Sequence, residues 1–145
     1  MDVIAPRRPS SRLNAVRVAD AMTTGLISCP PETPLRAVAR IMTERRVHAV
    51  YVFDYGVEDD ENVELWGLVS DLDLVAAARG ELDAETARDV SITPLVTVLS
   101  DDTLDHAARL MAEYGVSHLA VISPTTGRPV GVLSTLDIAR VVAAA

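Results

Sequence analysis

The chain lacks several features that common protein classes require. It has one cysteine, Cys29, and no group of cysteines and histidines with zinc-ligand spacing, which excludes an internal disulfide and a zinc module. No apolar run is long enough to cross a bilayer, and Arg7 and Arg8 stand where a secretion signal would be apolar. These absences predict a soluble, cytoplasmic protein without a membrane segment, in which Cys29 is a structural thiol.

Positive charge and aromatic rings are also scarce. The net charge is -8, aromatic residues make up 3% of the chain, and all 13 basic residues are arginine. An acidic body without stacking platforms disfavours nucleic acid as a partner. Residues 1–16, which carry Arg7, Arg8 and Arg12, nevertheless predict a flexible basic arm, and a solvated tail is favoured over a nucleic-acid contact.

The residue patterns of common active sites are missing as well. The sequence has no Ser/His/Asp order, no trio of metal ligands and no glycine-rich phosphate loop. Asp71 and Asp73 are close in sequence, but neighbouring positions at a helix start point apart and do not form an acid–base pair. We therefore expect a protein that is not an enzyme and requires no cofactor or metal.

What the chain does contain is an internal repeat. An offset of 69 positions aligns residues 19–54 with residues 88–123 without a gap, and pairs Arg40 with Arg109 and Met42 with Met111. The offset then falls to 64 and superimposes residues 67–73 on residues 131–137. The shared form is glycine, two aliphatic residues, serine, two residues and aspartate, written G-h-h-S-x-x-D. The repeat predicts two domains, residues 17–80 and 81–145, after the N-terminal arm.

Each copy shows the same sequence of local patterns. Apolar runs predict strands, and apolar residues at i, i+3, i+4 and i+7 predict amphipathic helices. The expected strands are 26–29, 47–53 and 65–69 in the first copy and 95–99, 116–122 and 130–133 in the second. Thr33 is the expected N-cap of a helix with Pro34 at its first position, and Asp102 is the expected cap in the second copy. Helices over 72–78 and from 136 onward complete an α/β (α+β) fold of two β-α-β-β-α repeats.

A module of about sixty residues is marginal alone, because it buries too little surface. Two such modules are therefore expected to pack as a pseudo-twofold pair.

The duplicated Ser-x-x-Asp element has two readings that are compatible with each other. It is the spacing of a capping box, in which the serine and the carboxylate satisfy the first amides of a helix. A helix start also favours anions, and a nearby aspartate can accept hydrogen bonds from sugar hydroxyls. The pair at Ser70 and Asp73 and the pair at Ser134 and Asp137 are therefore candidates both for capping and for ligand binding.

Three motifs together resemble a tandem pair of cystathionine-β-synthase (CBS) domains, also called a Bateman module. Residues 18–23 resemble its entry motif V-x-D-x-M-T, residues 114–122 resemble its central strand G-V-S-x-L-P-V-V, and both copies carry the G-h-h-S-x-x-D element. The resemblance covers roughly Val18 to Ala139 and implies a stand-alone regulatory module without catalysis. It also implies that AMP, ADP, ATP or another adenosyl ligand binds in two clefts between the repeats.

The resemblance also implies roles for individual residues. The aspartates, Asp73 and Asp137, would bind the ribose hydroxyls, with Ser70 and Ser134 beside ribose and phosphate. The early strands would line the base with Gly25, Ile27, Pro94 and Val96. The further ligand-binding candidates are Val47, His48, Val116 and Ser117 of the central strands, and Leu68 and Val132 of the G-h-h-S-x-x-D elements. Candidate phosphate contacts are Arg45, Arg46 and His118, although for each of them alone a solvated or locally bonded side chain is the favoured interpretation.

In this family each cleft combines the two repeats, so Ile27 would share a site with Asp137 and Val96 with Asp73. His48 replaces the commoner serine and Tyr51 the commoner proline, so the two clefts are expected to differ. If only one is occupied, the usual neighbour Ser117 favours the cleft of Asp73.

Three functions remain open at this point. The first is a ligand sensor that changes its interaction with a protein partner, whose identity the sequence does not give. The second is a ligand-free dimerisation or scaffolding module, and the third is a nucleic-acid-linked regulator that uses the basic arm. For either of the first two, the resemblance implies a homodimer in which four repeats form a disc.

Overall fold

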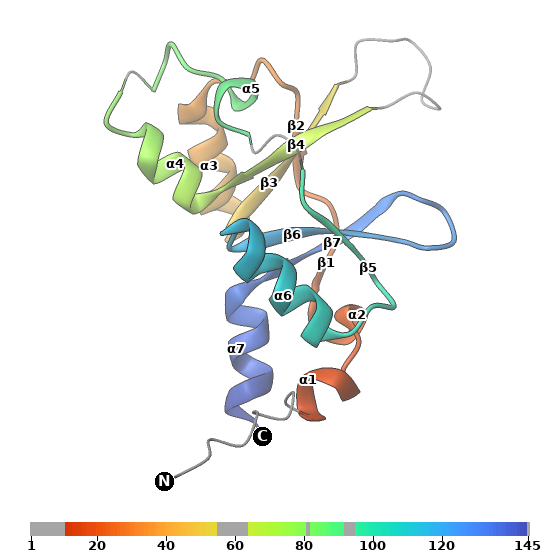
Figure 1. Ribbon diagram of the computed structural model, residues 1–145. Coiled ribbons are helices and arrows are strands. Elements are labelled where there is room, and N and C mark those ends of the chain that lie inside the picture. Colours follow the sequence, from red (N-terminus) through yellow and green to blue (C-terminus); the bar gives the residue numbers. More distant parts are fainter. Residues whose placement is uncertain (1–10, 55–63, 81, 92–94, 145) are drawn as a thin grey trace, which may run out of the picture. The chain divides into compact units, whose positions relative to one another are not determined.

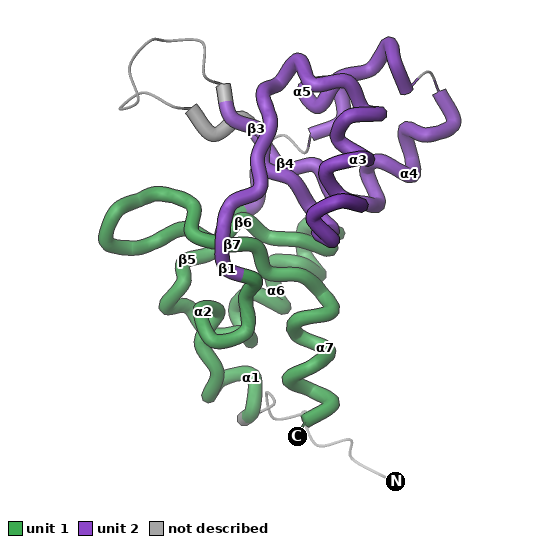
Figure 2. Tube along the Cα trace, turned by 180° about the vertical axis from the view of Figure 1, so that it is seen from behind, with its two compact units in different colours: residues 1–23, 97–145 green, residues 24–96 purple. Residues whose placement is uncertain are grey.

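The computed structural model describes residues 11–54, 64–80, 82–91 and 95–144, and it contains both helices and strands as the sequence predicts (Figure 1). The chain forms two compact units (Figure 2). Unit 1 comprises residues 1–23 and 97–145, and unit 2 comprises residues 24–96. In the part of the chain that is described, no helix is long and apolar enough to cross a membrane.

Unit 2 contains a three-stranded sheet in the order β2-β3-β4. Its elements are β2 (Ser28–Cys29), α3 (Leu35–Arg45), β3 (Ala49–Asp54), β4 (Glu64–Ser70), α4 (Asp71–Ala77) and α5 (Ala87–Val90). β3 pairs in parallel with β2 and antiparallel with β4. Its core joins Val38 and Met42 of α3 to alternate strand residues, Val50, Val52 and Val69. The spacing of four in the helix is the predicted apolar stripe, and the spacing of two in β3 places Val50 and Val52 on one face of the sheet.

Unit 1 repeats this arrangement. Its elements are α1 (Ser11–Ala15), α2 (Val18–Ala21), β1 (Thr23–Thr24), β5 (Thr97–Leu99), α6 (Leu104–Tyr114), β6 (His118–Ile122), β7 (Pro129–Ser134) and α7 (Thr135–Ala143). The sheet order is β1-β7-β6-β5. The register of β3 with β4 shifts between Val52 and Phe53, and that of β6 with β7 shifts between Val121 and Ile122. Because 52 and 121 are equivalent positions, the duplication extends to the local irregularity of the strands.

Both predicted helix caps were one residue too early. Pro34 is the N-cap of α3 and makes no side-chain cap bond, and Thr103 is the N-cap of α6, where its Oγ1 accepts the His106 amide at 3.2 Å. The Asp102 carboxylate accepts the Leu99 amide at 2.9 Å instead. Serine, threonine and aspartate at adjacent positions compete for the same role, and the backbone conformation decides between them.

Two short helices exchange places between the sequence repeats. Helix α2 opens the first repeat but belongs to unit 1, where the amides of Val18 and Ala19 donate to the carbonyls of Asp102 and Ser100, both at 2.8 Å. Helix α5 lies at the start of the second repeat but belongs to unit 2, where the amides of Ala87 and Arg88 donate to the carbonyls of Thr33 and Pro31, both at 2.9 Å. Each compact unit thus combines the main part of one repeat with the short helix from the start of the other repeat. The boundaries predicted from sequence, at 80 and 81, describe the repeats and not these units.

Part of the segment assigned to a flexible arm is helical. Residues 11–15 form α1, which packs against α6 and α7 in unit 1. Arg17, which follows, donates from its guanidinium to the Asp101 carbonyl at 2.9 Å. Arg7 and Arg8 lie outside the described residues.

Helices α3 and α6 end at equivalent residues with different backbone strain. The C-cap of α3 is Arg46, with φ 54° and ψ 48°, and the C-cap of α6 is Gly115, with φ 64° and ψ 36°. Both lie in the left-handed region, which glycine adopts freely and other residues only at a cost.

Arg46→Gly should raise the free energy of unfolding by about 0.5–1 kcal/mol, because it relieves this strain. The matched change Gly115→Ala should lower it by about 1 kcal/mol. Urea denaturation of both variants would measure these effects. A destabilised Arg46→Gly protein would contradict the assigned strain.

Candidate ligand-binding site

The first Ser-x-x-Asp element is a complete capping box at the start of α4. The Ser70 amide donates to Asp73 Oδ2 at 2.8 Å, and the Asp73 amide donates to Ser70 Oγ at 3.2 Å. The Ser70 hydroxyl also donates to Asp73 Oδ2, at 2.9 Å. Within the described residues Asp73 Oδ1 accepts no hydrogen bond, so one carboxylate oxygen is available to a ligand while the other caps the helix.

The second element has the same frame and a different charge environment. The Ser134 amide donates to Asp137 Oδ2 at 2.8 Å, and the Asp137 amide donates to Ser134 Oγ at 3.2 Å. Asp137 is only 5% exposed, and its Oδ1 accepts a hydrogen bond from Arg140 at 3.2 Å. The equivalent of Arg140 in the first copy is Ala76. A buried carboxylate with a charged partner is held in one position, which suits both capping and recognition.

The central-strand candidates lie beside these boxes within their own repeats. The Asp71 amide donates to the His48 carbonyl at 2.8 Å, and the Thr135 amide donates to the Ser117 carbonyl at 3.0 Å. In the first copy the His48 ring Nδ1 also lies 2.9 Å from Asp71 Oδ2. His48 is therefore engaged by a carboxylate, whereas Ser117 Oγ lies 2.9 Å from the His118 ring.

The other predicted binding residues lie at varied depths. Leu68 is fully buried in β4, and Ile27, Val47, Val96, Val116 and Val132 are half-buried. Gly25 is exposed, with φ 99°, and Pro94 lies outside the described residues. Ile27 and Asp137 belong to different units, as do Ser117 and Asp73. The predicted sharing of clefts between repeats therefore stays a prediction.

The phosphate candidates also differ in exposure. Arg45 and Arg46 are exposed at the end of α3, while His118 is buried in β6 with 7% exposure. Among described residues, no group of three histidines, cysteines or acids could hold a metal ion. Cys29 is buried in the core of unit 2, and burial raises the pKa of its thiol although a hydrogen bond with Thr33 acts in the opposite direction. A raised pKa keeps the thiol protonated at neutral pH and agrees with a structural role.

Two structural features were not predicted from the sequence. The Asp137–Arg140 pair has the i, i+3 spacing of helical ion pairs, which could have revealed it. A third capping box joins Thr86 and Asp89 at the start of α5, where the Thr86 amide donates to Asp89 Oδ2 at 2.9 Å. It has the same S/T-x-x-D spacing outside the G-h-h-S-x-x-D elements, so this spacing alone does not distinguish a ligand site from an ordinary helix start.

The glycine of the second element is required by close packing. A Cβ on Gly131 would lie 2.5 Å from the Thr23 carbonyl oxygen and 3.0 Å from Met22 Sδ. The first of these is a backbone atom of β1, which cannot move away as a side chain can. Gly131 therefore lets the entry motif lie against β7.

Gly131→Ala should lower the free energy of unfolding by about 1–3 kcal/mol, because β1 must shift to admit the methyl group. Gly80→Ala is the matched control: its nearest atom would be 3.4 Å away, so the change should stay within about 0.5 kcal/mol. Thermal and urea denaturation would compare the two. Equal stability of both variants would contradict the close approach.

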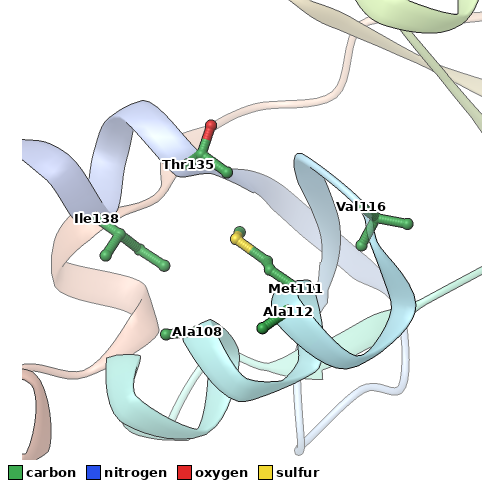
Figure 3. A pocket seen from close by; sticks show the side chains of 6 residues that line it. All are labelled: Ala108, Met111, Ala112, Val116, Thr135 and Ile138. Carbon is green, nitrogen blue, oxygen red and sulfur yellow. The ribbon is translucent and has the colours of Figure 1, made fainter.

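A second feature of unit 1 is a hollow beside α6 and α7, which lie side by side (Figure 3). Its volume is about 320 Å³. It is lined by Ala108, Met111, Ala112, Val116, Thr135 and Ile138. Large apolar side chains are exposed on α7 and on the equivalent α4, where Leu136 is 50%, Val142 56%, Leu72 62% and Val75 65% exposed.

Two β-α-β-β-α repeats, each with a Ser-x-x-Asp capping box at the start of its last helix, define a tandem domain pair. The chain belongs to the CBS-domain family: the model of the CBS domain matches residues 18–80 and 87–144. The predicted resemblance is thereby confirmed. Proteins of this family are generally regulatory and non-catalytic.

The chain is also similar to a protein of known sequence. The chain is 26% identical over 132 residues to an uncharacterised protein, MK0525, of Methanopyrus kandleri; the match covers 89% of this chain and 64% of that protein. The chain thus spans just under two thirds of the length of this relative.

Among solved structures, the CBS domain pair of MJ0100, in complex with 5′-methylthioadenosine and S-adenosyl-L-methionine, has a TM-score of 0.74 at 20% identity and covers 89% and 97% of the two chains. The CBS protein PAE2072 of Pyrobaculum aerophilum, complexed with AMP, has a TM-score of 0.70 at 26% identity and covers 84% and 89%.

Proposed function

We propose that this protein is a regulatory module that binds an adenosyl ligand, with AMP, ADP or ATP as the first candidates, and signals through a change in its interaction with a protein partner. The observation that carries the proposal is that, in a chain of the CBS family, the capping boxes fix the carboxylates of Asp73 and Asp137 and leave Asp73 Oδ1 without a hydrogen bond from any described residue. A fixed carboxylate at a helix start can accept hydrogen bonds from both ribose hydroxyls without paying to order itself.

The ligands of related structures support this choice. PAE2072 holds AMP, and the MJ0100 pair holds two other adenosyl compounds. Adenosine is the part that these ligands share, so the proposal extends first to the adenosine moiety. We retain the family arrangement as part of the proposal: Asp73 shares a cleft with Val96 and Ser117, and Asp137 shares one with Ile27 and His48. We also retain the cytoplasm as the place where the protein acts.

Ligand binding is tested by thermal unfolding in the presence of AMP, ADP, ATP, NAD and S-adenosylmethionine. A ligand at a hundred times its Kd should stabilise the folded protein by about 2.7 kcal/mol, which corresponds to a shift of roughly 5–10 °C for a chain of this size. Asp73→Ala and Asp137→Ala should each reduce the shift. If no ligand of the panel changes the melting temperature of the apo protein, the proposal fails.

A matched control separates ligand binding from helix capping. Asp89→Ala removes the carboxylate of the third capping box, which lies outside the G-h-h-S-x-x-D elements. It should lower the melting temperature of the apo protein much as the other two changes do, since each removes a cap worth about 1 kcal/mol. The ligand-induced shift should remain complete in Asp89→Ala.

A dimerisation or scaffolding module that binds no ligand is the second candidate, and the exposed apolar residues of α4 and α7 support it. A homodimer is proposed in either case. Static light scattering at micromolar concentration should give twice the chain mass of 15.5 kDa, and Val142→Asp should lower it toward the monomer. A wild-type protein of monomeric mass would contradict the dimer.

A further inference from the structure

The two Ser-x-x-Asp elements differ in charge. The first turn of α4 carries two carboxylates, Asp71 and Asp73, with no basic residue in that helix. The first turn of α7 carries Asp137 alone, and Arg140 pairs with it at 3.2 Å. The formal charge of these groups is therefore −2 at the first element, from two aspartates, and zero at the second, from one aspartate and one arginine.

The first amides of the two helices also differ in what they bond. At α4 the amides of Asp71, Leu72 and Asp73 already donate to the His48 carbonyl, to Asp71 Oδ1 at 2.9 Å and to Ser70 Oγ. At α7 the amides of Thr135 and Asp137 donate to Ser117 and Ser134. The Leu136 amide has no acceptor among the residues that the structure describes. The Asp71 carboxylate therefore accepts the hydrogen bond of the Leu72 amide. Thr135, the equivalent residue in the second copy, leaves the Leu136 amide without such an acceptor.

We infer that Asp71 is a specificity residue: it makes the Ser70–Asp73 element reject phosphate, so that this element takes an uncharged or cationic adenosyl ligand while nucleotides bind at the Ser134–Asp137 element. This inference rests on the proposed function. A phosphate beside Ser70 would be repelled by the carboxylates of the first turn of α4, where the first amides already have acceptors. A phosphate beside Ser134 would instead have the Leu136 amide as a donor and the exposed Arg140 as a cation. In the sequence analysis, the resemblance to the family favours the Asp73 cleft as the occupied one, because Ser117 is the usual neighbour. For nucleotides, the charge of Asp71 reverses this expectation and favours the Asp137 cleft.

Isothermal titration calorimetry of the full chain with AMP and adenosine tests the inference. The two probes share base and ribose and differ by the phosphate. In the wild type, adenosine should bind at both elements, and the ratio of AMP affinity to adenosine affinity should differ between the two elements by about tenfold or more. Asp73→Ala and Asp137→Ala assign the sites: Asp137→Ala should lose the stronger AMP site and keep adenosine binding at the other.

The decisive variants exchange the distinguishing residues. Asp71→Thr should raise AMP affinity at the weaker site by about tenfold and change adenosine affinity by less than about threefold, and Thr135→Asp should lower AMP affinity at the stronger site by a similar factor. The gain in AMP affinity of Asp71→Thr should become smaller as the salt concentration rises. Asp71→Asn keeps an oxygen for the Leu72 amide and should show the same direction if Asp71→Thr folds poorly.

The outcomes separate the two hypotheses. An equal ratio of AMP affinity to adenosine affinity at the two elements of the wild type, or AMP affinity that is unchanged in Asp71→Thr and Asp71→Asn, would overturn the inference and leave the proposed function standing if adenosine still binds. If neither AMP nor adenosine binds and the wider ligand panel gives no thermal shift, the proposed function fails and the inference falls with it.

Discussion

The hydrogen bonds that close each unit with a helix from outside its own sequence repeat are the interactions on which the rest of the fold depends. In unit 1 the amide of Leu104, the first residue of α6, donates to the Val16 carbonyl at 3.0 Å; in unit 2 the amide of Leu35 donates to the Glu85 carbonyl at 3.0 Å. The first amides of a helix have no partner within it, so a neighbouring segment must supply one when the helix start is buried. Leu35 and Leu104 are both fully buried, as are Val18 and Ala87 of the exchanged helices. Neither repeat can bury its first helix alone, and this explains why they occur as a pair.

The same constraint positions the candidate site. Because α2 runs directly into β1, holding α2 on unit 1 places Thr23 against Gly131, at the head of the second G-h-h-S-x-x-D element. Strand β7 then ends at Ser134, opposite His118 of β6, and α7 begins at the next residue. The site residues are thus fixed by sheet register and by one glycine, and not by contacts that the ligand would have to create.

The elements set by local pattern could be predicted from the sequence. Apolar periodicity located α3 and α6, the apolar run over 47–53 located β3, and the duplication located both Ser-x-x-Asp turns. The predicted caps were wrong because Thr33, Pro34, Asp102 and Thr103 all suit a helix start, and the backbone angles decide among them. The exchange of α2 and α5 could not be predicted, because it depends on contacts between residues such as Val18 and Asp102, which are far apart in the chain. Aligning the repeats shows which residues are equivalent but not which repeat each short helix joins.

The prediction of a ligand site at the Ser-x-x-Asp elements stays a prediction, and the capping-box spacing alone is an incomplete reason for it. Serine and aspartate at this spacing also form the capping box of Thr86 and Asp89, so every helix with such a start needs these residues whether or not a ligand binds. Their presence in both copies therefore reports the duplicated fold. What distinguishes one copy from the other lies in positions that the cap does not use, Asp71 against Thr135 and Ala76 against Arg140. Because the cap leaves these positions free to vary, they can change the charge of a ligand site without altering the frame that holds it, and this is where a duplicated site can become two sites with different ligands.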